Sequence, residues 1–139
     1  MTPQPLAVDD TQAIRAVIEL AVQSLQSDHF DDYFDLFTDD AVWMIPSRFQ
    51  DIGIDEARSF YGFTDKFRFD QRLTIDEIML AGDWAFVRIS LDGHLRAKSD
   101  LHAAPLRSIS RHMWILQRQQ DGSWMIARDI WNNPKSNKE

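Results

Sequence analysis

The chain has 139 residues, a formal net charge of −7 and a sequence pI near 5.0. A negative field repels phosphate groups, which argues against nucleic acid and against an anionic membrane surface as the main partner. The absence of cysteine excludes disulfides, thiolate nucleophiles and sulfur-ligated metals. Hydrophobic residues make up 44% of the chain and charged residues 27%, so we expect one globular domain over residues 1–139 with a single core.

The beginning of the chain carries no sign of a targeting segment. Residues 1–10 lack the basic flank and the continuous apolar run of a signal peptide. No stretch approaches the roughly 20 apolar residues that a membrane span needs. We therefore expect a cytoplasmic protein that does not enter a membrane.

Two helices are predicted first. Asp9 and Gln12 resemble a capping pair, and apolar residues then recur at helical spacing as Ile14, Val17, Ile18, Ala21, Val22 and Leu25. A shorter helix is predicted to begin near Asp28, whose carboxylate could accept backbone N–H bonds. It would carry an aromatic stripe of Phe30, Tyr33, Phe34 and Phe37. Such a stripe is typical of a core, and a cofactor-binding face is the alternative.

A short strand and a third helix come next. Asp39-Asp40 breaks the apolar pattern and is interpreted as a turn. Residues 41–45 then predict a strand that ends at Pro46, because proline cannot donate to a strand ladder. After Gly53 we expect a helix whose buried face holds Ala57, Phe60, Tyr61 and Phe67, and Gly62 favours an early end to it.

From Leu73 the apolar period changes to two, which indicates strands. Gly82-Asp83 and Asp121-Gly122 predict two-residue hairpins, since such turns need a residue that tolerates positive φ. The predicted strands cover residues 73–81, 84–96, 107–119 and 123–132. The expected fold class is therefore α+β, with one short and about four long strands in a curved antiparallel sheet around three N-terminal helices. The core would span residues 10–133, and the polar tail 134–139 would be frayed.

The first long strand changes its apolar face. Leu73 and Ile75 are odd-numbered, whereas Ile78 and Leu80 are even-numbered. A β-bulge near Asp76 would reconcile the two faces and bend the strand. The alternative is that both faces are partly buried.

Three segments resemble signatures of the nuclear transport factor 2-like, or SnoaL-like, superfamily. They are the helix-to-strand junction at residues 34–43, the hairpin at 82–85 and the closing hairpin at 120–126 with Trp131-Asn132. The element order over residues 10–133 is similar to the same superfamily. The resemblance implies a cone around an internal apolar pocket and a homodimer through the outer sheet face. It does not fix the activity, because the superfamily hosts isomerases, cyclases, dehydratases and non-catalytic modules.

A simple steroid isomerase is not expected. Members of that group place a carboxylate at a position that corresponds roughly to Ile45, an acidic oxyanion donor where this sequence has Trp114 and Ile115, and a tyrosine near the position of Ala21. All three groups are therefore missing, which favours another chemistry.

Two charged candidates lie on the last strands. Arg128 alternates with Ile126 and Ile130, so on a concave face its charge would need a ligand anion or an ion pair with Asp76 or Glu77. Asp129 has the opposite parity and is interpreted as an interface residue.

The preceding strand carries His112, which alternates with Ser110, Trp114 and Leu116, while Arg111 has the opposite parity. One of the two must face the pocket. A histidine there could act as a general acid or base, or it could be hydrogen-bonded in the core without a catalytic role.

The leading hypothesis is a pocket for an apolar cyclic ligand, with cofactor-free isomerisation, dehydration or cyclisation if the protein is an enzyme. His112 would be the base and Arg128 the oxyanion stabiliser, and the substrate would be bound by Trp43, Ile45, Tyr61, Trp114 and Asn132. The four histidines are widely scattered and show no metal-binding spacing, so no metal is expected.

Two other hypotheses remain open. The first is a non-catalytic ligand-binding or dimerisation module, whose outer sheet face would carry Trp84, Phe86 and Trp131. The second is a small subunit of a ring-hydroxylating dioxygenase, suggested by residues 43–46 and Arg48.

Overall fold

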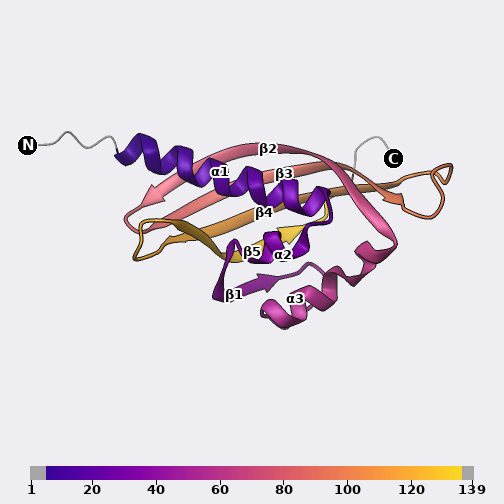
Figure 1. Ribbon diagram of the computed structural model, residues 1–139, viewed down its shortest axis with the longest axis horizontal. Helices are drawn as coiled ribbons and strands as arrows, with labels where there is room; N and C mark the ends of the chain where they lie inside the picture. The colour runs from indigo at the N-terminus through magenta and orange to yellow at the C-terminus, as the bar shows by residue number, and fades with distance from the viewer. Residues whose placement is uncertain (1–5, 136–139) are drawn as a thin grey trace, which may run out of the picture.

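The structure is a computed structural model that describes residues 6–135. Its elements in chain order are α1 (Leu6–Gln26), α2 (Phe30–Phe34), β1 (Phe37–Met44), α3 (Ile54–Phe60), the 3₁₀ helix η1 (Tyr61–Asp65), β2 (Phe67–Ala81), β3 (Trp84–Ala97), β4 (Leu106–Arg118) and β5 (Trp124–Asn132). The long strands curve together behind the helices, and α1 runs along the sheet (Figure 1). This arrangement confirms the predicted α+β class. Of the tail predicted to fray, residues 136–139 lie outside the described residues.

The sheet is mixed, whereas we predicted it to be antiparallel. The strand order is β1-β5-β4-β3-β2, and β1 pairs with β5 in parallel while the other neighbours are antiparallel. The hairpin signals determine the direction of β3 relative to β2 and of β5 relative to β4, because a two- or three-residue turn reverses the chain. No such turn joins β1 to its partner, and side-chain alternation says nothing of strand direction.

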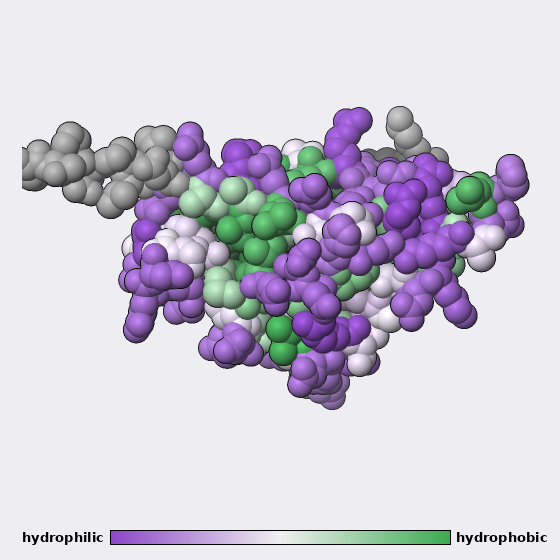
Figure 2. Space-filling model, viewed as in Figure 1, coloured by the Kyte–Doolittle hydropathy of each residue, from purple (hydrophilic) through white to green (hydrophobic). Residues whose placement is uncertain are grey.

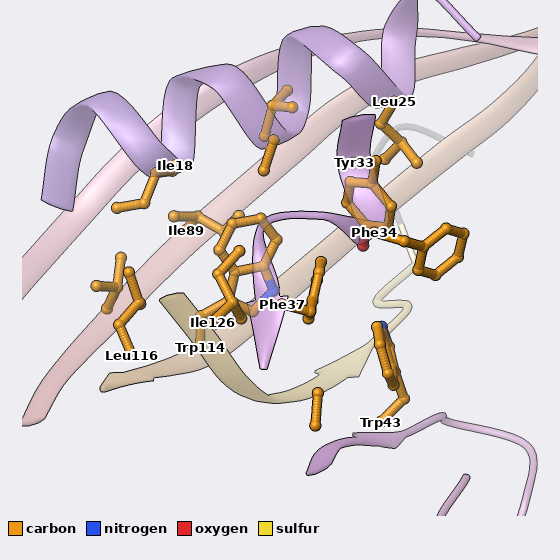
Figure 3. Close-up of a cluster of buried hydrophobic side chains, with 14 of the residues drawn as sticks. Ile18, Leu25, Tyr33, Phe34, Phe37, Trp43, Ile89, Trp114, Leu116 and Ile126 are labelled. Carbon is orange, nitrogen blue, oxygen red and sulfur yellow. The ribbon is translucent and has the colours of Figure 1, made fainter. Parts of the chain in front are cut away.

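Helix α1 lays an apolar stripe on the concave face of the sheet. Ile14, Ile18, Ala21 and Leu25 are at most 5% exposed and recur every three or four residues. Figure 3 shows Ile18 above Trp114 and Ile126 of the sheet, and Leu25 above Tyr33 of α2. The predicted start of this helix was wrong, since α1 already runs from Leu6 and Asp9 lies inside it.

Helix α2 begins without the predicted carboxylate cap. Its N-cap is His29, which makes no side-chain capping bond. Asp28 takes a positive φ of 64° and its Oδ2 forms an ion pair with Lys98 Nζ at 3.0 Å. Of the aromatic stripe, Tyr33 and Phe34 are buried in α2, but Phe37 already begins β1.

Strand β1 is longer than predicted. It begins at Phe37, and the predicted turn at Asp39-Asp40 is instead an exposed pair inside the strand, where the pairing with β5 shifts register. The bulge lets two charged residues stay in solvent without ending the strand. As predicted, α3 follows Gly53, and the helix tightens into η1 at Tyr61 beside Gly62.

The hairpin between β2 and β3 is confirmed, with Ala81 paired to Trp84 and Gly82 at φ 64°. The bulge at Asp76 is also confirmed, because the register shifts between Ile75 and Glu77. Strand β2 starts at Phe67, six residues earlier than predicted. The closing hairpin has three loop residues instead of two, since Gln119 N donates to Ser123 O at 2.7 Å.

A third bulge lies in β5 and was not predicted. Ile115 pairs with Arg128 but Leu116 pairs with Ile126, which leaves Ala127 as the extra residue. A bulge changes which face the following side chains occupy. Before the bulge, Trp124 and Ile126 point into the core. After the bulge, Asp129 points into the core.

A charged contact joins the N-terminal part of α1 to the closing hairpin between β4 and β5. Arg118 Nη1 and Nη2 donate to the two carboxylate oxygens of Asp10 at 2.7 and 2.8 Å, and the Arg118 guanidinium lies 4.6 Å from the ring centroid of Trp124. On the face that carries α1, hydrophobic side chains gather near the middle and hydrophilic ones surround them (Figure 2). Within residues 6–135, no helix is long and apolar enough to cross a membrane.

Candidate functional site

A cavity of about 210 Å³ lies between the helices and the inner face of the sheet. Most of its walls are aromatic or aliphatic, and its polar lining comes from Tyr33, Tyr61, Gln71, Ser108, Ser110, His112 and Asn133. Sites for drug-sized ligands usually measure roughly 300–1,000 Å³. The cavity therefore fits a compound of one or two rings better than a four-ring steroid.

The histidine of the cavity is held by a buried carboxylate. His112 Nδ1 lies 2.8 Å from Asp129 Oδ1, and the side chain of Asp129 is fully buried. An ionised carboxylate only accepts, so Nδ1 must be the donor, and in the neutral ring Nε2 is then the acceptor. The pair therefore fixes both the orientation of the ring and its tautomer.

Two further contacts hold the imidazole of His112. Its Nε2 lies 2.8 Å from the Oγ atom of Ser110, two residues earlier on β4. The indole of Trp131, the residue opposite His112 on β5, stacks on the ring at a centroid distance of 5.1 Å and an interplanar angle of 22°. The ring is thus fixed in its plane by hydrogen bonds and along its face by the indole.

Two tyrosines that line the cavity bring their buried hydroxyls together. Tyr33 Oη and Tyr61 Oη are 3.4 Å apart, and these are the only tyrosines of the chain. Burial raises the pKa of Tyr33 well above its usual value, and the neighbouring Tyr61 and Asp129 raise it further. Burial, followed by the charge of Asp129, also raises the pKa of Tyr61. Both hydroxyls therefore stay protonated and can donate hydrogen bonds at neutral pH.

The predicted site residues lie at the cavity wall, in the core beside it, and on the outer side of the sheet. His112, Tyr61 and Trp114 line the cavity. Trp43 and Ile45 are buried in the core, where the ring of Trp43 stacks on Phe37 with centroids 4.6 Å apart.

Arg128 and Asn132 do not reach the cavity, which corrects the prediction that they share its face. Arg128 lies opposite Ile115 on the outer side of the sheet, and its Nη1 donates to the backbone oxygens of Asp40 and Ala127 at 3.2 and 2.6 Å. The bulge at Ala127 causes this difference, because it turns the even-numbered residues after it outward.

Three polar groups of the site were not assigned to it from the sequence. Asp129 was interpreted as an interface residue because a regular strand would place it outside. Tyr33 was counted with the apolar stripe of α2, although a hydroxyl within a run of phenylalanines is a signal in itself. Ser110 was noted only for its parity with His112.

The site offers little to a metal ion. Among the residues that the structure describes, no group of three or more His, Cys, Asp or Glu side chains lies close enough together to hold one. The arrangement of histidine, carboxylate and hydroxyls can instead move a proton and stabilise a nearby oxyanion.

The family is shown by a direct match: residues 14–126 fit the model of the SnoaL-like domain. The chain belongs to this family, as the helix-to-strand junction and the two hairpins indicated. Among curated proteins, none matches the sequence.

Solved structures share the fold at low sequence identity. A ketosteroid isomerase-like protein from Erwinia carotovora atroseptica is 24% identical, with a TM-score of 0.77 over 97% of this chain and 100% of its own. A protein provisionally named scytalone dehydratase, from Novosphingobium aromaticivorans, is 15% identical, with a TM-score of 0.76 over 93% of this chain and 87% of its own. Another from the same organism, provisionally named aromatic ring hydroxylase, is 18% identical, with a TM-score of 0.73 over 98% and 94%. Identities this low establish the shared fold but not the activity, which has to be inferred from the residues of the site.

Proposed function

We propose that the protein is an enzyme that transfers protons on a carbonyl compound of one or two rings, without a cofactor. His112 is the general base, Asp129 orients it, and the hydroxyls of Tyr33 and Tyr61 stabilise the oxyanion. The observation that carries the proposal is the buried contact between His112 Nδ1 and Asp129 Oδ1 at the wall of a largely apolar cavity. The size of that cavity limits the substrate class.

The reaction begins with removal of a proton from the carbon next to the carbonyl group. Nε2 of His112 accepts that proton, and the imidazolium that forms is stabilised by Asp129 and by the face of the Trp131 indole. The negative charge moves to the carbonyl oxygen, where the neutral tyrosine hydroxyls can donate hydrogen bonds. Ser110 must turn its hydroxyl away from Nε2 when the substrate binds.

The enolate has two outcomes that suit this site. Loss of a hydroxyl group from the next carbon gives dehydration, and return of the proton to another carbon gives isomerisation. In both outcomes the imidazolium returns its proton, to the departing hydroxyl in dehydration and to the other carbon in isomerisation. Arg128, our first candidate for the oxyanion stabiliser, has no part in this scheme.

The proposal can be tested without knowledge of the natural substrate. In deuterium oxide, NMR would follow exchange of the α-protons of small ring ketones such as cyclohexanone and 1-tetralone. The wild-type protein should accelerate exchange over buffer, and His112→Gln should reduce the acceleration about 10²–10⁴-fold, the usual range for a general base. His102→Gln, in the exposed loop before β4, is the matched control and should exchange like the wild type.

The alternative is a non-catalytic binding module. Binding of these ketones without any acceleration of exchange would support it and contradict the enzyme proposal. If the His112→Gln protein accelerates exchange as much as the wild type, His112 is not the general base.

We also propose a homodimer through the outer face of the sheet. Ile130 on that face is 42% exposed and lies opposite Met113, which is half-buried. Trp131, expected on this face, points inward to His112 instead. A dimer at micromolar concentration in sedimentation, converted to monomer by Ile130→Glu, would support the proposal, and a wild-type monomer would contradict it. The dioxygenase-subunit hypothesis and the cytoplasmic location stay predictions.

A further inference from the structure

Three side chains of the cavity form a continuous chain of hydrogen bonds. Ser110 Oγ lies 2.8 Å from His112 Nε2, and His112 Nδ1 lies 2.8 Å from Asp129 Oδ1. The three residues are 7%, 8% and 1% exposed, and Ser110 and His112 both line the cavity. The order is therefore hydroxyl, imidazole, carboxylate, with the hydroxyl at the cavity wall.

The order of the two ring nitrogens matters for what the serine can do. Asp129 accepts the proton on Nδ1, so the lone pair of Nε2 points to the serine hydroxyl and can take its proton. A serine so placed is an activated nucleophile, because a base lies within hydrogen-bond reach and a third group orients that base.

A second serine of the same strand shows that the arrangement is particular to position 110. Ser108 lies two residues earlier on the same face and also lines the cavity. Its Oγ accepts a hydrogen bond from Gln71 Nε2 at 3.0 Å and has no contact with an imidazole. Ser108 therefore shares the cavity and the strand with Ser110 but lacks the base.

We propose that Ser110 is a covalent nucleophile and that the protein also hydrolyses small carboxylic esters. The inference goes beyond proton transfer on ring ketones and does not depend on it. The cavity volume of about 210 Å³ restricts the ester to a short acyl group or a single ring. The chain has no cysteine, so no thiol competes with Ser110 as a nucleophile.

The reaction balances with water as the second substrate. Ser110 Oγ bonds to the carbonyl carbon of the ester while its proton passes to His112 Nε2. The bond to the leaving alcohol then breaks, and the alcohol takes that proton. A water molecule attacks the acyl group, gives a proton to His112 and releases the acid, and the proton returns to Ser110. The tyrosine hydroxyls supply donors for the oxyanion in both steps.

The test uses p-nitrophenyl acetate and a fluorophosphonate on the purified full chain, followed by intact-mass spectrometry and peptide mapping. We expect one acetyl or phosphonyl group per chain, on Ser110. Ser110→Ala should lose the modification. Ser90→Ala should keep it, because Ser90 does not line the cavity and its hydroxyl donates to Asp76 Oδ2. His112→Gln should slow acylation about 10²-fold or more. Circular dichroism of each variant shows whether it is folded.

Ser110→Cys protects the test against a folding defect of the alanine variant. The substituted residue would be the single thiol of the chain, so its acylation by the same ester would place a nucleophile at this point of the cavity. Modification of a lysine or tyrosine in place of Ser110, equal modification of Ser110→Ala, or no modification of the folded wild type would overturn the inference. These reagents contain no ring ketone, so a negative result leaves the exchange experiment on ketones unaffected.

Discussion

Asp129 faces His112 because one extra residue, Ala127, interrupts the alternation of β5 between the last buried isoleucine and the aspartate. The bulge places a fully buried carboxylate beside the imidazole, in a position where a regular strand would expose it. A buried carboxylate without a partner lowers the stability of the fold, so the contact of Asp129 with His112 serves both the stability of the protein and the geometry of the site.

We predict that substitutions at this pair are strongly non-additive. His112→Leu leaves a buried charge without its partner and should reduce the free energy of unfolding by about 3–5 kcal/mol. Asp129→Leu leaves a buried N–H donor unpaired and should cost about 1–3 kcal/mol. The double variant should lie closer to the wild type than the sum, with a coupling energy of about 0.5–3 kcal/mol. Urea unfolding followed by circular dichroism measures all four proteins, and additivity would contradict the pairing.

The sequence allowed the α+β class, the β2–β3 hairpin and the bulge at Asp76 to be predicted, because these depend on local turn chemistry and on a visible change of apolar parity. The bulge at Ala127 has no such signature: Ile126 and Ala127 are both apolar, and Arg128 and Asp129 are both charged. Parity limited the pocket-facing candidate of β4 to His112 or Arg111, and it gave no partner for the histidine. Pairing between β1 and β5 is equally hidden, since it joins segments far apart in the chain without a turn.

The two tyrosines give a prediction about alkaline pH. Their pKa values in the folded protein are raised above the ordinary value of 10.0. The stability that the two tyrosines contribute is therefore fully present below pH 10, and it is lost as the pH rises above that value, by about 1.4 kcal/mol per tyrosine per pH unit. Because the chain has no other tyrosine, tyrosinate absorbance should appear only together with the loss of circular dichroism. Ionisation in the folded protein near pH 10 would show that the hydroxyls are not buried.

Gly93 gives a prediction about the curvature of the sheet beside the cavity. It pairs with Gln71 on β2, and a Cβ atom added to it would lie 2.6 Å from Gln71 Cα and still closer to the backbone oxygen of Asp70. Because these are backbone atoms, the strands must move apart, and Gly93→Ala should cost about 1–3 kcal/mol. Gly62→Ala is the control, since beyond the adjacent residues and the backbone of its own helix no atom lies within 4 Å of the added Cβ, and it should stay within about 0.5 kcal/mol of the wild type. Equal thermal midpoints for the two variants would contradict this close approach.

The contact between Asp10 and Arg118 should make stability depend on acid pH. The hydrogen bonds from Arg118 hold the pKa of Asp10 below its ordinary value of 3.8. A lowered pKa in the folded state stabilises the protein above pH 3.8, and that contribution is lost as the pH falls through the lower value. Asp10→Asn should therefore lower the thermal midpoint at pH 7 slightly, and the difference should shrink on acidification. Because the pair fastens α1 to the closing hairpin, hydrogen exchange in the described part of α1 should also rise at pH 7. An Asp10→Asn protein with the same midpoint as the wild type at pH 7 would show that the bidentate contact does not hold the helix in solution.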